Sequence, residues 1–548
     1  MVVLSQVVRF VITSHAFNED IFLSEILFCE LHELNLAMSN ISFLDGGAQL
    51  PTSDAQTLMK QTAEKHPDQI AVISVHQKPI DLPGLEADLS EARLSWTYKQ
   101  LNRCSENLAD RLTSLGLVRG TSILLVTGNC AEWVLFCWTS IMLECPFVTV
   151  DPAVVANPDE IQHMLRVVCP GVLVAENEDL AAGLEKNAPH EISQTFLNIS
   201  LAPLRERYTL EEKHPMHYQA NAQAPPQSHP IGWLHLADLW PTRPESVPFP
   251  KRCPANLQPD VVTIGFTSGT TSLPKACPLS KANIRSVCAL AAGGRGYPVG
   301  TRILQHSPAH HSTGSIFNIT ALSCGGTIIY PSSKFDVLAS LDTIESEKCN
   351  YTSTVPAVIK AFSMVPDISC RDLSSLWHIQ LGGATVSADT LKFCRDVLKV
   401  PSIGISWGMT ENVAPIGVRL TGTMAIEFDG DDIVPVGRPA PGMKVKVCAP
   451  DSRTPLQRGE EGDLHAGGPQ VISGYLNTES DNFYDDDEGH WIVTGDIASI
   501  DAEGQVRILG RQKDIIIRGG VNISPASIER RLNSIPGVEV STLRPIMQ

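Results

Sequence analysis

The chain has 548 residues, of which 43% are hydrophobic and 19% are charged. These proportions are typical of a folded, water-soluble protein, and the length predicts more than one domain. The 42 basic and 60 acidic residues give a formal net charge of −18. This balance argues against a nucleic-acid-binding protein, because neutralising the phosphates of a duplex requires a basic surface.

The cysteine pattern bears on the cellular compartment. The 14 cysteines are scattered from Cys29 to Cys448, without CxxC spacing or a zinc-binding arrangement with histidine. We therefore expect reduced, mostly buried thiols in a cytoplasmic protein, although a peroxisomal location stays open. Arg9 interrupts the short apolar run at the N-terminus, and no stretch is apolar enough to cross a membrane. Neither a signal peptide nor a membrane span is expected.

A regular order of strands and helices begins after an N-terminal extension. Residues 1–50 are unplaced, although the pattern over Phe17–Met38 is compatible with an amphipathic helix. The periodicity then predicts strand 94–98, helix 99–115, strand 122–126, helix 131–143, strand 147–150 and strand 171–175. This alternation favours an α/β architecture with parallel sheets that are covered on both faces. The proline-rich stretch at about 215–259 is expected to be a surface excursion rather than a packed element.

A hydroxyl-rich loop follows the predicted strand 261–266. It starts at Thr267, ends at Lys275 and includes Ser268, Gly269, Thr270 and Thr271. Short side chains let backbone N–H groups approach a polyphosphate, hydroxyls donate hydrogen bonds, and a lysine supplies a mobile charge. The loop is not a Walker A motif, because Pro274 precedes the lysine and Ala276 stands where a Ser or Thr would bind magnesium. Taken alone, it could equally be a polar surface turn.

Three further motifs follow predicted strands. The turn Gly382-Gly383-Ala384 offers bare backbone against which a flat base could lie. The segment Trp407-Gly408-Met409-Thr410-Glu411 offers an aromatic face for a purine, a hydroxyl for a phosphate and a carboxylate for Mg²⁺. At the end of strand 491–493, Asp496 of Thr494-Gly495-Asp496 is suited to accept hydrogen bonds from ribose hydroxyls. Together with the loop, these motifs predict a site for a purine nucleoside triphosphate at strand ends.

In combination, the motifs resemble the adenylate-forming (AMP-binding) superfamily. This superfamily contains acyl- and aryl-CoA ligases, peptide-synthetase adenylation domains and beetle luciferases. The likeness extends from about Ala55 to about Glu539 and includes Gly474-Tyr475-Leu476 and Gly510-Arg511-x-x-Asp514. The stretch 510–529 is similar to the domain junction of fatty-acyl-CoA ligases. His310-His311-Ser312-Thr313-Gly314 resembles the version found in acyl- and aryl-CoA ligases, which favours an acid without an amine.

The resemblance implies a fold and a reaction. The expected fold is a large N-terminal domain at 51–510, made of two stacked αβ subdomains plus a small β-barrel, followed by a partial α+β C-terminal domain at 511–548. The implied reaction uses ATP, Mg²⁺ and CoA. A carboxylate attacks the α-phosphorus of ATP to give an acyl-adenylate and pyrophosphate, and a thiol then displaces AMP. The expected partners are a small carboxylic acid and either CoA or a carrier-protein thiol.

The resemblance also assigns roles by position. Lys275 and the hydroxyl-rich loop would hold the β- and γ-phosphates, Thr410 would touch the α-phosphate, and Glu411 would hold the magnesium ion. The adenine would be framed by Gly382, Gly383, Ala384 and Trp407. Asp496 and Arg511 would fix the ribose, and Lys513 would be the hinge of the C-terminal domain. His311 and Gly314 would lie at the acyl pocket.

The sequence departs from the family pattern in three places. Ser272 and Ala276 replace glycines, and Trp407 replaces the usual tyrosine, which keeps an aromatic face but removes a hydroxyl. The sequence ends at Gln548 and no lysine follows Lys513, whereas the family places a lysine of the C-terminal domain beside the reacting carboxylate. We therefore expect a truncated C-terminal domain and an adenylation barrier raised by about 3 kcal/mol for one missing cation.

Three functions are compatible with these observations. The leading hypothesis is an acyl- or aryl-CoA ligase. The second is an enzyme of secondary metabolism that loads an acyl-adenylate onto a carrier-protein thiol. The third is a truncated nucleotide-binding protein with impaired catalysis, and an incorrectly predicted last exon would explain the short C-terminal part equally well.

Overall fold

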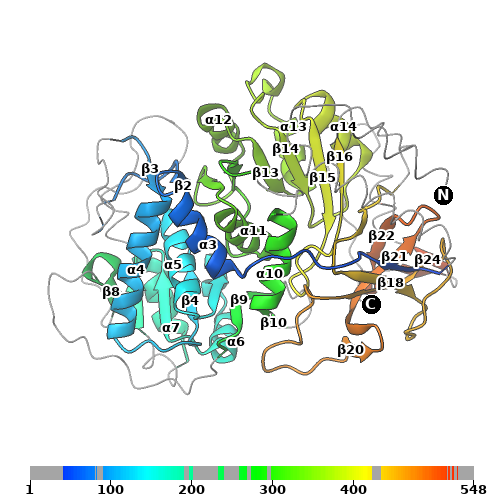
Figure 1. Ribbon diagram of the computed structural model, residues 1–548, viewed down its shortest axis with the longest axis horizontal. Helices are drawn as coiled ribbons and strands as arrows, with labels where there is room; N and C mark the ends of the chain where they lie inside the picture. Colours follow the sequence, from blue (N-terminus) through cyan, green and yellow to red (C-terminus); the bar gives the residue numbers. More distant parts are fainter. Residues whose placement is uncertain are drawn as a thin grey trace, which may run out of the picture.

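The computed structural model describes residues 41–80, 82, 91–189, 197–201, 233–239, 258–267, 273–292, 298–421, 433–514, 516–518, 521–523 and 528. In this part of the chain, two large sheets with helices on their faces lie side by side, and a smaller sheet lies beside the second one (Figure 1). No helix of the described residues is both long and apolar enough to cross a bilayer. The helix considered for Phe17–Met38 lies outside the described residues.

The first large sheet has seven strands in the order β10-β9-β5-β4-β6-β7-β8. Neighbouring strands are parallel except for β9 and β10. In chain order the strands are β4 (Ile123–Val126), β5 (Phe147–Val150), β6 (Val172–Ala175), β7 (Leu197–Ser200), β8 (Trp233–His235), β9 (Val261–Phe266) and β10 (Ala276–Ser280). β4, β5 and β6 are buried along their whole length, as expected for parallel strands that are covered on both faces.

The second large sheet has nine strands in the order β17-β16-β15-β14-β13-β11-β12-β2-β3. Its central pairs from β2 to β15 are parallel, and the pairs at both edges are antiparallel. The strands are β2 (Ile70–Ser74), β3 (Leu94–Thr97), β11 (Arg302–Leu304), β12 (Thr327–Tyr330), β13 (Tyr351–Thr354), β14 (His378–Leu381), β15 (Ser402–Trp407), β16 (Ile416–Thr421) and β17 (Arg438–Pro439).

The helices alternate with the parallel strands along the chain. They are α3 (Ala55–Lys65), α4 (Tyr98–Ser114), α5 (Ala131–Met142), α6 (Pro158–Val168), α7 (Glu178–Asn187), α10 (Lys281–Leu290), α11 (Ser312–Ser323), α12 (Val337–Glu347), α13 (Pro356–Ser363) and α14 (Ala388–Asp396), with 3₁₀ turns at η1 (Pro152–Ala156) and η4 (Ile368–Cys370). The predicted alternation over 94–175 is confirmed, and helix ends differ by one residue. α4 starts where Thr97 forms a capping box with Gln100, which satisfies two backbone donors at the helix start.

One prediction about the first sheet is wrong. Within the proline-rich stretch predicted at about 215–259, the described residues 233–239 form a packed element rather than a surface excursion, because β8 pairs with β7 and the 3₁₀ turn η2 (Leu236–Leu239) follows it. Trp233, Leu236 and Leu239 are buried. The burial of three large apolar side chains stabilises this short segment despite the prolines around it in sequence.

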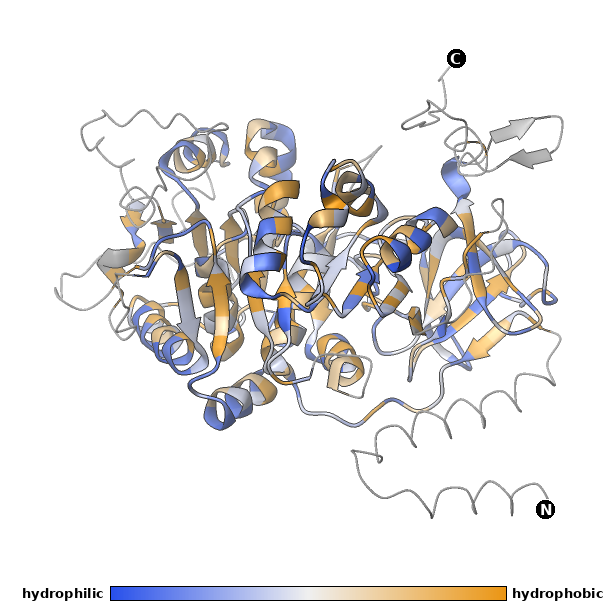
Figure 2. Ribbon diagram, turned by 90° about the horizontal axis from the view of Figure 1, so that it is seen from above, coloured by the Kyte–Doolittle hydropathy of each residue, from blue (hydrophilic) through white to orange (hydrophobic). Residues whose placement is uncertain are grey.

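A continuous apolar core joins the two large sheets. α5 lies at its centre, with Trp133 packed edge-on against Phe147 at 4.9 Å and Trp138 against Tyr98 at 5.9 Å between ring centroids. α3 packs against α4, α10 and α11. Figure 2 shows the apolar residues concentrated in the strands and on the inner faces of these helices. The shared core therefore fixes the loops that follow the strands of the two sheets relative to one another.

The third sheet is small and antiparallel, in the order β1-β18-β19-β21-β20 with β22 beside β21. Its strands are β1 (Phe43–Asp45), β18 (Lys444–Cys448), β19 (Gly462–Gly467), β20 (Phe483–Asp486), β21 (Gly489–Ile500) and β22 (Val506–Arg511). Residues 41–50 were left unplaced by the sequence, but β1 pairs with β18, so this segment belongs to the small sheet. The 3₁₀ turn η5 (Gln512–Asp514) and the pair β23 (Ile516–Arg518) and β24 (Val521–Ile523) follow, and the domain limit at 510/511 stays a prediction.

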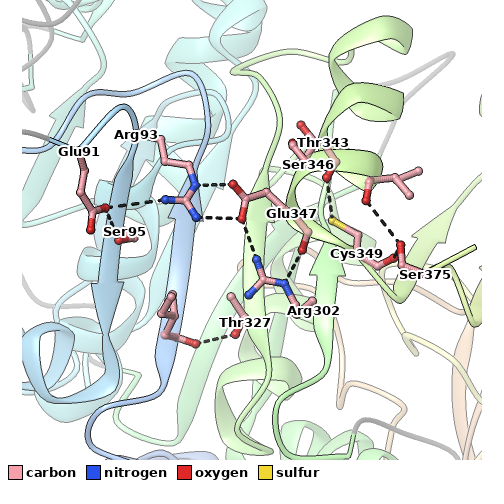
Figure 3. A network of polar contacts seen from close by, with 12 residues as sticks. Glu91, Arg93, Ser95, Arg302, Thr327, Thr343, Ser346, Glu347, Cys349 and Ser375 are labelled. Carbon is pink, nitrogen blue, oxygen red and sulfur yellow. Dashed lines mark hydrogen bonds and ion pairs between the residues drawn. The ribbon is translucent and has the colours of Figure 1, made fainter. Parts of the chain in front are cut away.

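A buried carboxylate connects helix α12 to two strands of the second sheet (Figure 3). Glu347, at the end of α12, accepts hydrogen bonds at Oε2 from Arg93 Nη2 at 3.0 Å and from Arg302 Nη2 at 2.7 Å. Arg93 Nε also pairs with Oε1. Because Arg93 precedes β3 and Arg302 begins β11, one side chain joins two strands to a helix.

Replacing Glu347 with alanine is expected to lower the free energy of unfolding by about 2 kcal/mol, because two guanidinium groups lose their common partner. The cost stays below that of a fully buried pair, since the arginine side chains are 31% and 28% exposed. Chemical denaturation followed by tryptophan fluorescence measures this change. Glu64→Ala is the control, because its pair with Lys60 is exposed and 4.0 Å long, and it should change stability by less than about 0.5 kcal/mol. Equal losses in the two variants would contradict the role of Glu347.

Candidate active site

Lys275 stands where the hydroxyl-rich loop returns to the first sheet. The antiparallel pair β9–β10 brings the two ends of the loop together. The backbone N–H of Thr267 donates to the Lys275 carbonyl at 3.0 Å, and the backbone N–H of Lys275 donates to Thr267 Oγ1 at 3.0 Å. Ser268, Gly269, Thr270 and Thr271 lie outside the described residues, as does Ser272. These hydrogen bonds hold the two ends of the predicted phosphate loop, including its lysine, next to each other.

The end of β9 meets the loop that follows β15 of the second sheet. A Cβ atom placed on Gly265 would lie 3.0 Å from Thr410 Cγ2. This glycine therefore allows a close approach between the strand that leads into the phosphate loop and the segment that carries Thr410 and Glu411. Two of the motifs that the sequence places at strand ends are brought together across the two sheets.

The segment around Glu411 is held by its own hydrogen bonds. Asn412 Oδ1 accepts from the Met409 N–H at 3.0 Å, and Gln470 Oε1 accepts from the Ala414 N–H at 3.2 Å. Glu411 itself is 4% exposed. Burial raises the pKa of the Glu411 carboxyl, whereas a hydrogen bond from Tyr475 and the charges of Arg511 and Lys275 act in the opposite direction. A buried carboxylate thus lies within electrostatic reach of two cations from distant parts of the chain.

Tyr475 links Lys275 to Glu411. The sequence motif Gly474-Tyr475-Leu476 contains this residue, but no role was predicted for it. The hydroxyl of Tyr475 donates to Glu411 Oε1 at 2.6 Å. Lys275 Nζ lies 4.7 Å from the centroid of the Tyr475 ring, within the range of a cation–π contact. The available signal was an aromatic residue next to a glycine within a motif already noted, which does not indicate what its side chain contacts.

The prediction that Asp496 stands at the end of a strand is wrong. Asp496 lies inside the 12-residue strand β21, and the register of β21 against β19 shifts beside Leu464. At this bulge Gly495 has a φ of +73°, and Thr494 Oγ1 donates to the Leu464 carbonyl at 2.8 Å. A bulge redirects side chains locally, and Asp496 here is 4% exposed.

Asp496 is held by two donors. Arg511 Nε lies 2.8 Å from Oδ1, and Trp407 Nε1 donates to Oδ2 at 2.8 Å. Burial raises the pKa of the Asp496 carboxyl, while the Arg511 charge and the Trp407 hydrogen bond oppose this shift. The sequence expects Trp407 to contribute only an aromatic face, but its N–H orients the carboxylate that is predicted to hold the ribose. Since Trp407 precedes Thr410 by three residues, the Asp496 cluster adjoins the Lys275–Tyr475–Glu411 cluster.

Comparison with known proteins identifies the family. The family model described as AMP-binding enzyme matches residues 59–476. The chain belongs to the AMP-binding enzyme family. It is similar to the acyl–CoA ligase GME11374 of Pestalotiopsis microspora, with 26% identity over 89% of this chain and 83% of the relative. It is also similar to the mitochondrial medium-chain acyl-CoA ligase ACSF2 of Danio rerio, with 28% identity over 89% of this chain and 77% of the relative.

A solved structure confirms the fold of this AMP-binding enzyme. The ATP-bound MatB from Rhodopseudomonas palustris superposes with a TM-score of 0.67 at 21% identity, covering 89% of this chain and 84% of MatB. The predicted α/β architecture, with a large N-terminal domain and a smaller C-terminal part, is therefore confirmed. The resemblance stated from the sequence motifs is confirmed as well.

The glycine turn of this AMP-binding enzyme follows β14, as the sequence predicts. A Cβ atom on Gly382 would lie 3.1 Å from the Ser406 carbonyl oxygen, which places the turn beside the end of β15. Gly383 has a φ of +73°, and both Gly383 and Ala384 are exposed. The turn and Trp407 thus come from adjacent strand ends, and their contact with an adenine ring stays a prediction.

The histidine segment starts α11. His311 caps this helix, because its Nδ1 accepts from the Thr313 N–H at 3.3 Å. Gly314 allows tight packing, since a Cβ atom there would lie 2.1 Å from the Pro308 carbonyl oxygen. The neighbouring His310 Nε2 lies 3.6 Å from Asp151 Oδ2, beyond the end of β5, and burial lowers the pKa of His310. These contacts give His311 and Gly314 local structural roles, and their place at an acyl pocket stays a prediction.

Lys513 lies in η5, two residues after Arg511, and is exposed. Its predicted role as a hinge is compatible with this position between the small sheet and the β23–β24 pair but stays a prediction. The cysteines follow the expectation, since the twelve within the described ranges are free thiols and most are buried. Within the described residues no group of three or more His, Cys, Asp or Glu side chains could hold a metal ion.

Proposed function

We propose that this AMP-binding enzyme is an acid–thiol ligase that forms AMP. It would join a carboxylic acid to the α-phosphate of ATP, release pyrophosphate, and pass the acyl group from the adenylate to the thiol of CoA. The observation that carries the proposal is the meeting of three distant segments: Lys275 and Glu411 contact the same tyrosine, and Asp496 contacts Trp407 of the Glu411 segment. Together the three segments supply a lysine for the phosphates, a carboxylate for magnesium and a carboxylate for the ribose.

The proposed roles follow from charge and position. Lys275 would neutralise the terminal phosphates, Thr410 would donate to the α-phosphate, and Asp496 with Arg511 would fix the ribose. The hydroxyl-rich loop would supply N–H and O–H donors to the β- and γ-phosphates. Catalysis of this kind needs positioning and charge stabilisation rather than an enzyme nucleophile. Gly382, Gly383, Ala384 and Trp407 would frame the adenine, and His311 and Gly314 would border the acid.

Magnesium suits the donor set around Glu411. Mg²⁺ usually keeps several waters and binds through one or two carboxylates together with substrate phosphates. Glu411 supplies one buried carboxylate next to the half-buried hydroxyl-bearing residue Thr410, and no larger group of ligands is present among the described residues. Bound Mg²⁺ would neutralise charge on the triphosphate during attack by the acid.

Three arms of one experiment test this function. Exchange of radiolabelled pyrophosphate into ATP, run over a panel of aliphatic and aromatic acids, is expected to show acid-dependent exchange. The acid that supports exchange is then offered with CoA or with a phosphopantetheinylated carrier protein, and we expect the CoA thioester. Exchange without thioester formation on CoA, but with loading of the carrier, would favour a loading enzyme. Wild-type protein that binds ATP but exchanges pyrophosphate with no acid would contradict the proposed ligase.

The proposal includes a cytoplasmic location, which the free thiols support and which imaging of a tagged protein would distinguish from a peroxisomal one.

Trp407→Phe is expected to raise the KM for ATP about tenfold, because the ring remains but the charged acceptor Asp496 loses one donor. The measurement is the ATP dependence of pyrophosphate exchange together with equilibrium ATP binding. Trp491→Phe is a matched control, since Trp491 Nε1 also donates to a carboxylate, Asp486 Oδ1 at 2.7 Å, within the small sheet that carries Asp496. The control should keep the KM for ATP. An equal KM for ATP in both variants would show that Trp407 does not support the predicted ribose site.

A further inference from the structure

The segment Ile472–Leu476 crosses between the two charged groups of the candidate site. At one end, the Ile472 N–H donates to the Glu411 carbonyl at 3.0 Å. At the other end, the Leu476 N–H donates to the carbonyl of Ala276 at 2.9 Å, one residue after Lys275. Backbone hydrogen bonds thus fasten this segment to the Glu411 loop and to the strand that carries Lys275.

The Tyr475 side chain repeats this connection within the site. Its hydroxyl donates to Glu411 Oε1 at 2.6 Å, and its ring lies under Lys275 Nζ at 4.7 Å. The ring is itself packed edge-on against Phe483 of β20, with 5.2 Å between the centroids. Phe483 in turn stacks on His490 at 5.9 Å. The tyrosine is therefore held by the small sheet while it contacts groups attached to both large sheets.

We propose that Tyr475 is a positioning residue that orients Glu411 toward a magnesium ion through its hydroxyl and holds Lys275 over the triphosphate through its ring. This inference rests on the proposed ATP site. A carboxylate has two oxygens, so the hydroxyl on Oε1 restrains the orientation of the group and leaves Oε2 for a cation. Because one protein carboxylate is the expected ligand, a partner that fixes its orientation has a large influence on metal binding.

The two contacts can be removed separately. Tyr475→Phe removes the hydroxyl and keeps the ring beneath Lys275, whereas Tyr475→Leu removes both. Tyr484→Phe is the matched control: its hydroxyl is also hydrogen-bonded, to His465 Nδ1 at 2.7 Å, and it lies in β20 next to Phe483, without contacting Lys275 or Glu411. All four proteins are first compared by thermal unfolding.

The readout is the affinity for ATP, measured by titration calorimetry in EDTA and again with saturating Mg²⁺. In Tyr475→Phe we expect the affinity in EDTA to stay at the wild-type value and the gain caused by Mg²⁺ to fall about tenfold, the usual cost of removing the partner of a metal ligand. In Tyr475→Leu the affinity in EDTA should fall as well, by about threefold, because Lys275 loses its aromatic support. Tyr484→Phe should match the wild type in both solutions.

Tyr475→Phe decides the inference, since removal of a hydroxyl preserves the packing of the ring. If it matches Tyr484→Phe with and without Mg²⁺, the positioning role is wrong while the ATP site stands. A wild-type protein that binds ATP in neither solution would overturn the proposed function and this inference with it.

Discussion

Replacing Lys275 with alanine is expected to lower acid-dependent pyrophosphate exchange by about 100-fold or more. Lys275 is the last residue of the predicted phosphate loop. Its side chain lies over the Tyr475 ring and within electrostatic reach of the buried Glu411. Removing one aligned positive group from such a site takes away stabilisation of the charge that develops on the phosphates, and losses of about 10² to 10³ are typical. The measurement is the initial rate of exchange at saturating acid over a range of ATP concentrations.

Lys281→Ala is the control for this variant. Lys281 is the first residue of α10, directly after the far end of β10; its side chain is 35% exposed and pairs with Glu144 at 2.9 Å. This variant should exchange pyrophosphate at the wild-type rate. If Lys275→Ala exchanges as fast as Lys281→Ala does, Lys275 does not act on the triphosphate and the assignment of the phosphate loop is wrong.

Glu411→Gln is expected to have the second large effect, a loss of about 100-fold in kcat/KM for Mg·ATP. The amide keeps the shape of the side chain and can still accept the hydrogen bond from Tyr475 OH, but it has no charge for a cation. Burial of a neutral amide at a position that is 4% exposed is tolerated better than burial of a charge, so folding should be preserved. Rates measured at increasing Mg²⁺ concentrations, together with circular dichroism, separate the two effects.

The matched control for Glu411→Gln is Asp463→Asn. Asp463 is also a buried carboxylate, 6% exposed, and burial raises its pKa, but it lies in β19. This control should retain the Mg²⁺ dependence of the wild type. A Glu411→Gln enzyme with normal activity and normal Mg²⁺ dependence would show that the metal, if one is required, is held elsewhere.

Local sequence signals were sufficient for much of the fold. Runs that are apolar or nearly so predicted β4, β5 and β6, because strands buried on both faces need no alternation of polar and apolar residues. The predicted helix 99–115 starts one residue later than α4, because the capping box of Thr97 and Gln100 that sets the start of α4 at Tyr98 was not used in the prediction. β8 was missed, since a three-residue strand among prolines contributes to the sheet only through its contacts with β7.

The site was predicted as a set of residues but not as a set of contacts. The positions of Lys275, Glu411 and Gly382 after strands follow from turn chemistry that is visible in the sequence. The bulge at Gly495 depends on the opposing Leu464, and the Trp407 N–H reaches an aspartate 89 residues away. The contacts of Tyr475 with Lys275 and Glu411 likewise depend on three separate parts of the chain. Such pairs are tertiary and leave no local pattern.

The most direct measurement is a crystal structure of the protein with Mg²⁺ and a non-hydrolysable ATP analogue. We predict one nucleotide whose terminal phosphates contact Lys275, whose metal ion contacts Glu411, and whose ribose hydroxyls contact Asp496. A nucleotide bound at another place, or one that leaves any of these three side chains without contact, would contradict the proposed site.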